Sequence, residues 1–360
     1  MRTFGIEEEF FVVEPLTGLP GVPHASARSE LLALSIGGAG TRSEFLACQL
    51  EGVGPICTEG FEALESAQMY RKALAHAVRD LGYHAVALGT PPRISTAPAV
   101  VSSGDRYRAI HSLCGELATS HYLSGLHVHV QVEDLDSGII ALNQLRRWLP
   151  ALTACGANSP YWRGHDTGFA SWRTIRYRQW ALQGIPPYFS DAQEYTDRMR
   201  FVLDADIVLD PGHVRWGARL SSSLPTIEVR VADTQMKASN SILLALIIRS
   251  LVDASLTGEP EGFQPMPEAI DIAQWQAAKF GLHGNNFDPT DGRKTSATGM
   301  MHRLMEYIRD ALKRNGDYEY VTAGLSGILQ QGTGASIQRR HFKQGGFTAV
   351  LDEAALAIAD

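Results

Sequence analysis

The residues best suited to chemistry are carboxylates and histidines that alternate with apolar residues along predicted β-strands. The run Phe4 to Val13 carries Glu7, Glu8 and Glu9 among aromatic and β-branched residues. Successive side chains of a strand point to opposite faces, so Glu7 and Glu9 share one face and Glu8 must find a partner on the apolar face. Adjacent carboxylates repel one another and lose hydration when buried, so a divalent cation would remove the cost of gathering them.

A second stretch offers nitrogen ligands. Leu126 to Val132 alternates strictly, which predicts a strand with His127, His129 and Gln131 on one face and apolar residues on the other. An H-x-H pair on a strand suits metal binding because both imidazoles point into the same space. A single histidine on such a face is commonly structural, and this pair alone leaves both explanations open.

Two more predicted strands also carry ionisable residues on one face. The strand predicted over 45–53 presents Glu51, and the strand predicted over 226–232 presents Glu228 and Arg230. Each of these groups alone is explained by solvated acids or by an ion pair. Four polar strand faces together are hard to accommodate as solvated sheet, so we expect one curved sheet whose concave face holds cations.

Composition limits the partners. The chain has 360 residues, 44% hydrophobic and 20% charged, with a formal net charge of −7 and a pI near 6.0. This balance argues against nucleic acid or an anionic membrane as the main partner.

The four cysteines form no C-x-x-C pair, which indicates a reduced compartment. The longest apolar run, Ile242 to Ile248, is too short to span a bilayer, and no signal peptide is recognised. We expect a soluble, cytoplasmic protein.

The order of the predicted strands and helices indicates one α+β domain over 1–360, which is strand-rich to 235 and mostly helical from 236 to 360. Loops are predicted over 14–43, with a short helix near 29–34, and over 158–173, where exposed aromatic residues suggest a loop covering a ligand. A strand is expected over 83–88 and a Gly-rich turn over 330–340. No P-loop or Rossmann fingerprint is present. Helices are predicted over 61–81, 105–120, 137–157 with a break near Pro150, 191–203, 238–256, 270–282 and 296–315.

Several short motifs occur in a fixed order along the chain: Gly5-Ile6-Glu7-Glu8-Glu9, Gly125-Leu126-His127-Val128-His129-Val130, Asn158-Ser159-Pro160-Tyr161-Trp162, Asp166-Thr167-Gly168, Thr226-Ile227-Glu228-Val229-Arg230 and Gly334-Ala335-Ser336. With this ordered set the chain resembles the glutamate–cysteine ligase type 2 family, the YbdK-like carboxylate–amine ligases, from residue 4 to about residue 340. The resemblance implies a glutamine-synthetase-like α+β fold. Its curved, mainly antiparallel sheet would have helices on the convex side, a helical C-terminal part, and MgATP with an acidic substrate on the concave side.

The resemblance also implies roles for individual residues. The implied metal ligands are Glu7, Glu9, Glu51, His127 and Glu228. Arg230 resembles an arginine that meets phosphate, and Arg219 resembles one near the substrate carboxylate or phosphates. We expect further pocket residues at Gln49, His129, Arg163, Asp166 and Thr167. Gly54, Pro91 and Gly217 depart from the family pattern, which affects the acceptor pocket more than the metal site.

The activity implied is ATP-dependent amide formation through an acyl phosphate, from glutamate and an amino acid or another amine. The cofactors would be ATP and Mg²⁺, or Mn²⁺ in its place, because carboxylate-rich sites favour hard cations. A homodimer is expected as the oligomeric state. Two alternatives stay open: a Zn²⁺- or Mn²⁺-dependent hydrolase built on His127 and His129, and a catalytically silent nucleotide-binding homologue.

Overall fold

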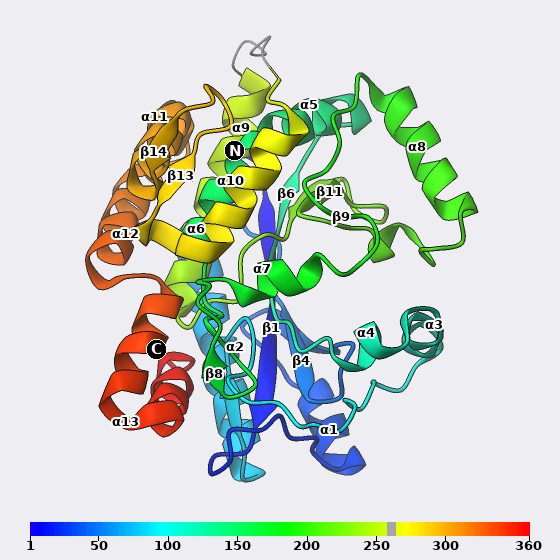
Figure 1. The fold of residues 1–360 in the computed structure, drawn as a ribbon, viewed down its shortest axis with the longest axis vertical. Helices are drawn as coiled ribbons and strands as arrows, with labels where there is room; N and C mark the ends of the chain where they lie inside the picture. Colours follow the sequence, from blue (N-terminus) through cyan, green and yellow to red (C-terminus); the bar gives the residue numbers. More distant parts are fainter. Residues whose placement is uncertain (258–263) are drawn as a thin grey trace.

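The computed structural model describes residues 1–257 and 264–360. In this part of the chain an eight-stranded antiparallel sheet has the order β11-β12-β6-β1-β4-β3-β2, and β5 pairs with the far end of β1 (Figure 1). Its strands are β1 (Phe4–Val13), β2 (Ser35–Ile36), β3 (Ala39–Ser43), β4 (Gln49–Val53), β5 (His84–Val86), β6 (Leu126–Gln131), β11 (Ala218–Leu220) and β12 (Thr226–Val229).

Three two-stranded ribbons complete the β-structure of the described residues. They pair β7 (Tyr161–Trp162) with β8 (His165–Asp166), β9 (Gln183–Gly184) with β10 (Arg215–Trp216), and β13 (Asn285–Phe287) with β14 (Lys294–Ser296).

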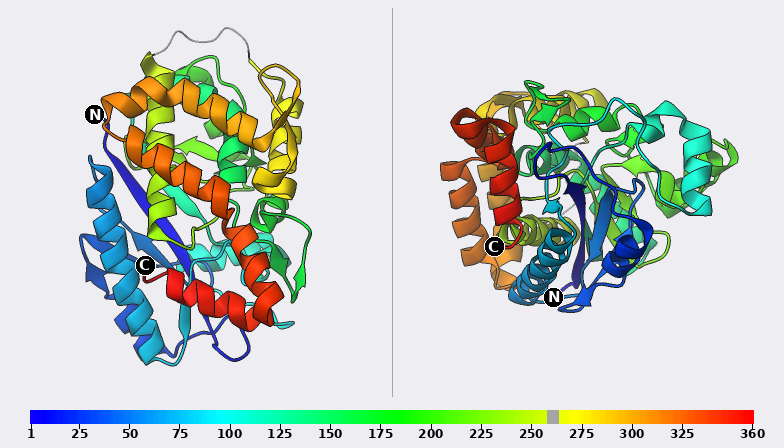
Figure 2. Two further views of the ribbon diagram at one scale, coloured as in Figure 1. Left: turned by 90° about the vertical axis from the view of Figure 1, so that its left-hand side faces the viewer. Right: turned by 90° about the horizontal axis from the view of Figure 1, so that it is seen from below.

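Helices make up most of the remaining structure, and those of the last third of the chain cover one side of the molecule together with α2 and α9 (Figure 2). Single 3₁₀ turns lie at Arg146–Trp148, Pro211–His213 and Gly281–His283. The α-helices are α1 (Ala25–Leu32), α2 (Gly60–Asp80), α3 (Asp105–Cys114), α4 (Glu116–Thr119), α5 (Leu135–Leu145), α6 (Leu149–Cys155), α7 (Trp172–Tyr177), α8 (Ala192–Asp204), α9 (Ala238–Thr257), α10 (Pro267–Phe280), α11 (Ala297–Arg314), α12 (Tyr318–Gln331) and α13 (Gly334–Ala357).

Strand β1 has one apolar face, and its opposite face is polar at Glu7 and Glu9. On the apolar face, Ile6, Phe10 and Val12 are buried in clusters that include residues of α2 and α9. Glu8 lies on this same face and is 3% exposed. Its carboxylate receives two hydrogen bonds from the guanidinium of Arg71 on α2, at 3.0 and 2.5 Å, and one from the hydroxyl of Ser241 on α9, at 2.5 Å. The partner that the sequence required for Glu8 is therefore supplied by two helices.

The predicted fold class is confirmed: an antiparallel sheet with helices on one face precedes a helical C-terminal part. The strand predicted over 45–53 is shorter, because a turn and a bridge from Leu46 to Val101 hold its first residues away from the ladder until Gln49. The segment 14–43 is not all loop: Gly37 and Gly38, both with positive φ, turn β2 into β3. Gly115, at φ 53°, divides the helix predicted over 105–120. Helix α12 was not predicted.

Helix α9 needs separate mention because it is apolar over 20 residues. Among the described residues it is the one helix whose length and hydropathy would allow it to cross a membrane, yet 78% of its most apolar window is buried inside the protein. It packs against α2, α5, α11 and α12. This burial on several sides is typical of the central helix of a globular core.

Candidate active site

The polar face of the sheet gathers the predicted residues through strand register. Glu7 lies directly opposite His127, and Glu9 lies directly opposite Glu51. One strand further along, His129 lies opposite Glu228. Residues directly opposite in an antiparallel pair have Cβ atoms about 4.5–5.5 Å apart, so their side chains meet. Segments distant in the sequence thus converge on one surface because the four neighbouring strands β4, β1, β6 and β12 share one face.

This surface forms the floor of a cavity of about 430 Å³. The described residues that line it include five carboxylates, two histidines and five arginines: Glu7, Glu9, Glu44, Glu51 and Glu228, His127 and His129, and Arg42, Arg106, Arg215, Arg219 and Arg230. The site is therefore large, charged and nearly balanced in formal charge.

The acidic end of the cavity is a tight cluster. Potential ligand atoms of Glu7, Glu51 and His127 all lie within 4.8 Å of one another, and so do those of Glu9, Glu44 and Glu51. Burial, followed by the charge of Glu44, raises the pKa of Glu9 to about 8. Burial, followed by the charges of Glu44, Glu7 and Glu9, also raises the pKa of Glu51. A bound cation would reverse this penalty, so the cluster fits a divalent metal.

His127 lies at the centre of the carboxylates. Its Nδ1 is 3.6 Å from Glu7 and 4.0 Å from Glu228, and its Nε2 is 3.7 Å from Glu9. The Nε2 atom is buried without a hydrogen-bond partner. Burial, together with the charge of Arg230, lowers the pKa of His127 to about 4. The imidazole is therefore neutral near pH 7 and free to donate a lone pair, as a metal ligand must be.

Glu228 links this cluster to the arginines. Its carboxylate is bound by Arg230 at 2.6 Å and by Arg219 at 2.7 Å. Burial alone would raise the pKa of Glu228, but Arg230 and Arg219 outweigh burial and lower it well below its usual range. Arg219 also donates to the backbone carbonyls of Pro211, Gly212 and Val214. Arg219 therefore fixes the loop beside the cavity as well as Glu228.

Four of the predicted pocket residues lie outside the lining of this cavity. Gln49 is buried and donates to Leu123 and Ser124. Arg163 is exposed at the β7–β8 turn with φ 52°. Asp166 pairs with Arg339 of α13 at 2.7 Å, and Thr167 donates to the carbonyl of Pro160. The exposure expected for the aromatic residues of the loop 158–173 is wrong for Tyr161 and Trp162, which are buried in the core. Its role in covering a ligand stays a prediction.

Other lining residues were not singled out as site residues, among them Glu44, Arg42 and Arg215. Glu44 lies just before the strand predicted over 45–53, and Arg215 lies in the two-residue strand β10, so no alternating pattern marks either residue. The available signal for Glu44 was only its place shortly before the strand that carries Glu51. At the departure Gly217, an added Cβ would come within 2.5 Å of Val231, so close packing requires glycine there.

Comparisons with known proteins identify the fold and the family of the chain. Two solved structures share the fold: a glutamate–cysteine ligase from Francisella tularensis in complex with AMP, and a bifunctional glutathione synthetase from Pasteurella multocida. Their TM-scores are 0.72 and 0.71 at 13% sequence identity, covering 100% and 99% of this chain and 89% and 52% of those chains. The fold is thus that of ligases which include glutamate–cysteine ligase.

The family is shown by sequence. The model for glutamate–cysteine ligase family 2 matches residues 3–351. Proteins from Saccharopolyspora erythraea and Nocardia farcinica, each named "Putative glutamate--cysteine ligase 2-1", are 35% and 36% identical. They match over 95% and 94% of this chain and 90% and 88% of their own lengths. The chain belongs to glutamate–cysteine ligase family 2.

Proposed function

We propose that this protein is an ATP-dependent carboxylate–amine ligase that joins glutamate, or a similar acid, to an amino acid or another amine. The observation that carries the proposal is the convergence of Glu7, Glu9, Glu51, His127 and Glu228 in one cavity, next to Arg230. Family membership supports a ligase, and the AMP bound to the Francisella tularensis structure supports a nucleotide site in this fold.

The chemistry begins with a carboxylate, which is a poor acylating agent. Its oxygen attacks the γ-phosphorus of ATP, the bond to the β-phosphate oxygen breaks, and ADP leaves. The amine nitrogen then attacks the acyl carbon, phosphate leaves with the C–O bonding electrons, and the amine loses a proton. Both first reactants are anionic, so the cavity must supply positive charge. Arg230 would stabilise the transferred group, and Arg219, which also binds Glu228, would keep this carboxylate in position beside it.

A divalent cation fits the donor set. Carboxylate oxygens from Glu7, Glu9 and Glu51 suit Mg²⁺ or Mn²⁺, and Glu44 adds a carboxylate to the same cluster. The unpartnered Nε2 of His127 is a further donor. When bound, the cation would neutralise phosphate charge and orient the triphosphate.

The hydrolase alternative needs His127 and His129 to act together. His129 lies on the same face, and its Nε2 is 3.7 Å from Glu7. However, its Nδ1 lies 3.0 Å from the hydroxyl of Thr226, and it joins neither compact ligand group found among the described residues. The abundance of carboxylates around His127 instead favours a hard cation.

One assay separates the candidates: ADP release with glutamate and a panel of amines, in Mg²⁺, in Zn²⁺ and with chelator. We expect Mg²⁺-dependent ADP release that requires both acid and amine. ATP-independent hydrolysis in Zn²⁺ would instead identify a hydrolase, and ATP binding without amine-dependent turnover would identify a silent homologue. We expect this activity to belong to the cytoplasm, where ATP is available.

A further inference from the structure

Asp233 is a carboxylate just beyond the end of β12, and it is only 1% exposed. Carboxylates are rarely buried to this extent unless they are paired and hydrogen-bonded. Its Oδ2 accepts hydrogen bonds from the main-chain N–H of Asn158 and the hydroxyl of Ser159, both at 2.7 Å. Its Oδ1 accepts a hydrogen bond from the hydroxyl of Ser171 at 2.9 Å. Asp233 therefore fixes both ends of the segment that precedes α7.

The same segment places Arg173, which lies in the first turn of α7 and is 2% exposed. The main-chain N–H of Arg173 donates to the hydroxyl oxygen of Ser159 at 3.0 Å, so this hydroxyl joins Arg173 to Asp233. The Nη1 of Arg173 lies 3.9 Å from Oδ1 of Asp233. A buried guanidinium needs a charge partner, because it has lost its hydration. Asp233 therefore determines where the Arg173 guanidinium lies.

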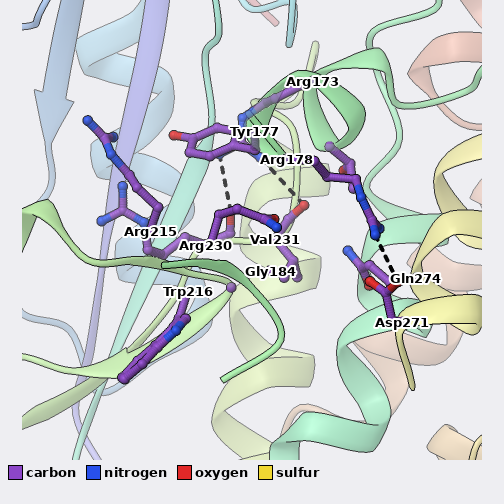
Figure 3. A pocket seen from close by; sticks show the side chains of 13 residues that line it. Arg173, Tyr177, Arg178, Gly184, Arg215, Trp216, Arg230, Val231, Asp271 and Gln274 are labelled. Carbon is purple, nitrogen blue, oxygen red and sulfur yellow. Dashed lines mark hydrogen bonds and ion pairs between the residues drawn. The ribbon is translucent and has the colours of Figure 1, made fainter. Parts of the chain in front are cut away.

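Arg173 in turn contacts the backbone of two strands of the active site. Its Nη2 donates to the carbonyl of Arg230 at 3.2 Å, and its Nη1 lies 3.5 Å from the carbonyl of Val231. Figure 3 shows Arg173 with dashed lines to the main chain of both residues. At the start of β6, a Cβ on Gly125 would come within 2.2 Å of the Arg173 guanidinium, so the two are closely packed. The N–H of Gly125 donates to the carboxylate of Glu9 at 2.6 Å.

The charge of Arg173 also acts on the acidic cluster. Burial and the charge of Glu44 raise the pKa of Glu9, and the charge of Arg173 opposes both. Because Arg173 and Asp233 are buried together, neutralising one of them leaves the other as an uncompensated charge. Loss of the Asp233 charge should therefore displace Arg173 from the backbone that it supports.

We propose that Asp233 is a positioning residue of the active site, which acts by holding Arg173 in place. Through Arg173 it fixes the main chain of Arg230 and the glycine that donates to Glu9. This inference rests on the proposed function, which assigns Glu9 to the metal and Arg230 to the transferred phosphoryl group. Asp233 itself is not among the described residues that line the main cavity. It therefore acts through its neighbours.

A purely structural role of Asp233 makes a different prediction, namely a loss of stability without a change in Mg²⁺ affinity. Asp317 provides the matched control for this alternative. It is 6% exposed, it pairs with the buried guanidinium of Arg249, and it belongs to the helical part of the chain, outside the described lining of the main cavity. Asp317→Asn thus neutralises a comparable buried carboxylate away from the site.

The test measures Mg²⁺ affinity by calorimetry without nucleotide, the melting temperature, and kcat and KM for ADP release. We expect Asp233→Asn to weaken Mg²⁺ binding about 10- to 100-fold, the range found when residues that orient metal ligands are changed. It should also lower kcat more than it raises the KM for ATP. Asp317→Asn should lower the melting temperature and leave Mg²⁺ affinity and kcat near wild type.

A double-mutant cycle tests the route through Arg173. If Asp233 acts by holding Arg173, the double variant Asp233→Asn/Arg173→Met should bind Mg²⁺ about as well as Arg173→Met alone, because coupled residues are not additive. Ser159→Ala keeps both charges and removes the hydroxyl that joins them. It should weaken Mg²⁺ binding about threefold or more.

The inference is overturned if folded Asp233→Asn binds Mg²⁺ like wild type, if Asp317→Asn weakens binding equally, or if the losses in the double variant are additive. Should Asp233→Asn fail to fold, wild-type Mg²⁺ affinity in Ser159→Ala overturns it instead. Absence of ADP release from wild type would refute the ligase proposal, while the Mg²⁺ affinities would still decide the role of Asp233. ADP release by wild type with unchanged kinetics and Mg²⁺ affinity in Asp233→Asn would do the reverse.

Discussion

Among the individual side chains described, Glu51 is the one that belongs to both compact ligand groups. It lies on β4 opposite Glu9 and reaches toward His127 and Glu44. Without a bound metal ion, this position is unfavourable for an ionised Glu51, because the carboxylate is buried and lies near the other carboxylates Glu44, Glu7 and Glu9. Function and stability therefore make opposite demands on this residue.

For Glu51→Gln we accordingly expect two opposite effects. The rate of ADP release should fall about 100-fold or more, since one preorganised charged group is removed. The melting temperature in chelator should rise, because like-charge repulsion is relieved. Kinetic assays and thermal melts measure both, with Glu14→Gln, outside the cavity, as control. Full activity in Glu51→Gln would contradict the assignment of Glu51 as a ligand.

Glu9 makes stability depend on pH. Its pKa is about 8 in the folded protein, raised from an ordinary value of 4.5. Between these values the folded state holds a proton that the unfolded chain has released. The stabilisation is thus complete below about pH 4.5 and is lost as pH rises through about 8. In chelator, the melting temperature should fall over this range. Because the cation binds the ionised carboxylate, Mg²⁺ should raise it more at about pH 8 than at about pH 5.

The control for this pH dependence is Glu9→Gln, which cannot ionise. It should flatten the decline in chelator and reduce the effect of Mg²⁺. The same slope in Glu9→Gln and wild type would show that other groups cause the decline.

At the scale of elements, β1 is fixed to the helical layer by the buried pair of Glu8 and Arg71. Arg71→Ala would leave Glu8 buried without its charge partner, which typically costs about 3–5 kcal/mol. Denaturant unfolding measures the loss of stability. Arg108→Ala, which breaks the exposed pair with Asp105, should change stability by less than about 1 kcal/mol. Equal effects of the two variants would mean that the buried pair has no special role.

The start of β6 depends on a glycine. A Cβ at Gly125 would come within 2.2 Å of the Arg173 guanidinium, and the Gly125 N–H donates to Glu9 at 2.6 Å. Gly125→Ala should therefore displace both groups and weaken Mg²⁺ binding, as a calorimetric titration would show. Gly327→Ala in α12, where nothing lies within 4 Å of the added Cβ, should stabilise by about 0.5–1 kcal/mol and leave Mg²⁺ affinity unchanged. Unaltered Mg²⁺ affinity in Gly125→Ala would contradict this coupling.

The polar face of the sheet could be predicted because side chains alternate between the two faces of a strand. The alternation of polar and apolar residue types in the sequence shows which residues share a face. Glu7, Glu51, His127 and Glu228 were found in this way, and the cross-strand register then brought them together. Glu44 and Arg215 were missed because no period marks residues at strand ends. The burial of Tyr161 and Trp162 in the segment 158–173 was not predicted, because it depends on α13 and other distant segments. Local pattern thus predicts faces, while loops depend on tertiary packing.

For the whole molecule, the two parts of the chain contribute differently. Every described residue that lines the main cavity lies between Glu7 and Arg230, whereas the last third supplies Leu312 and other core residues. Leu312→Ala should lower stability by about 2–5 kcal/mol through loss of buried volume. The KM for ATP and the Mg²⁺ affinity, measured below the melting range, should stay near wild type. A large change in either would show that the helical layer controls the site directly.

The three consecutive acids of β1 serve two incompatible environments, because Glu7 and Glu9 face the charged cavity while Glu8 is held by Arg71 in the helical layer. Adding or removing one residue upstream of them would turn each side chain of the strand to the opposite face. Glu7 and Glu9 would then both lie against the helical layer, where Arg71 now pairs with the single acid Glu8. Such a length change could be absorbed only by a bulge or by a second change of one residue nearby. The spacing of this strand is therefore constrained more tightly than the identity of any single apolar residue within it.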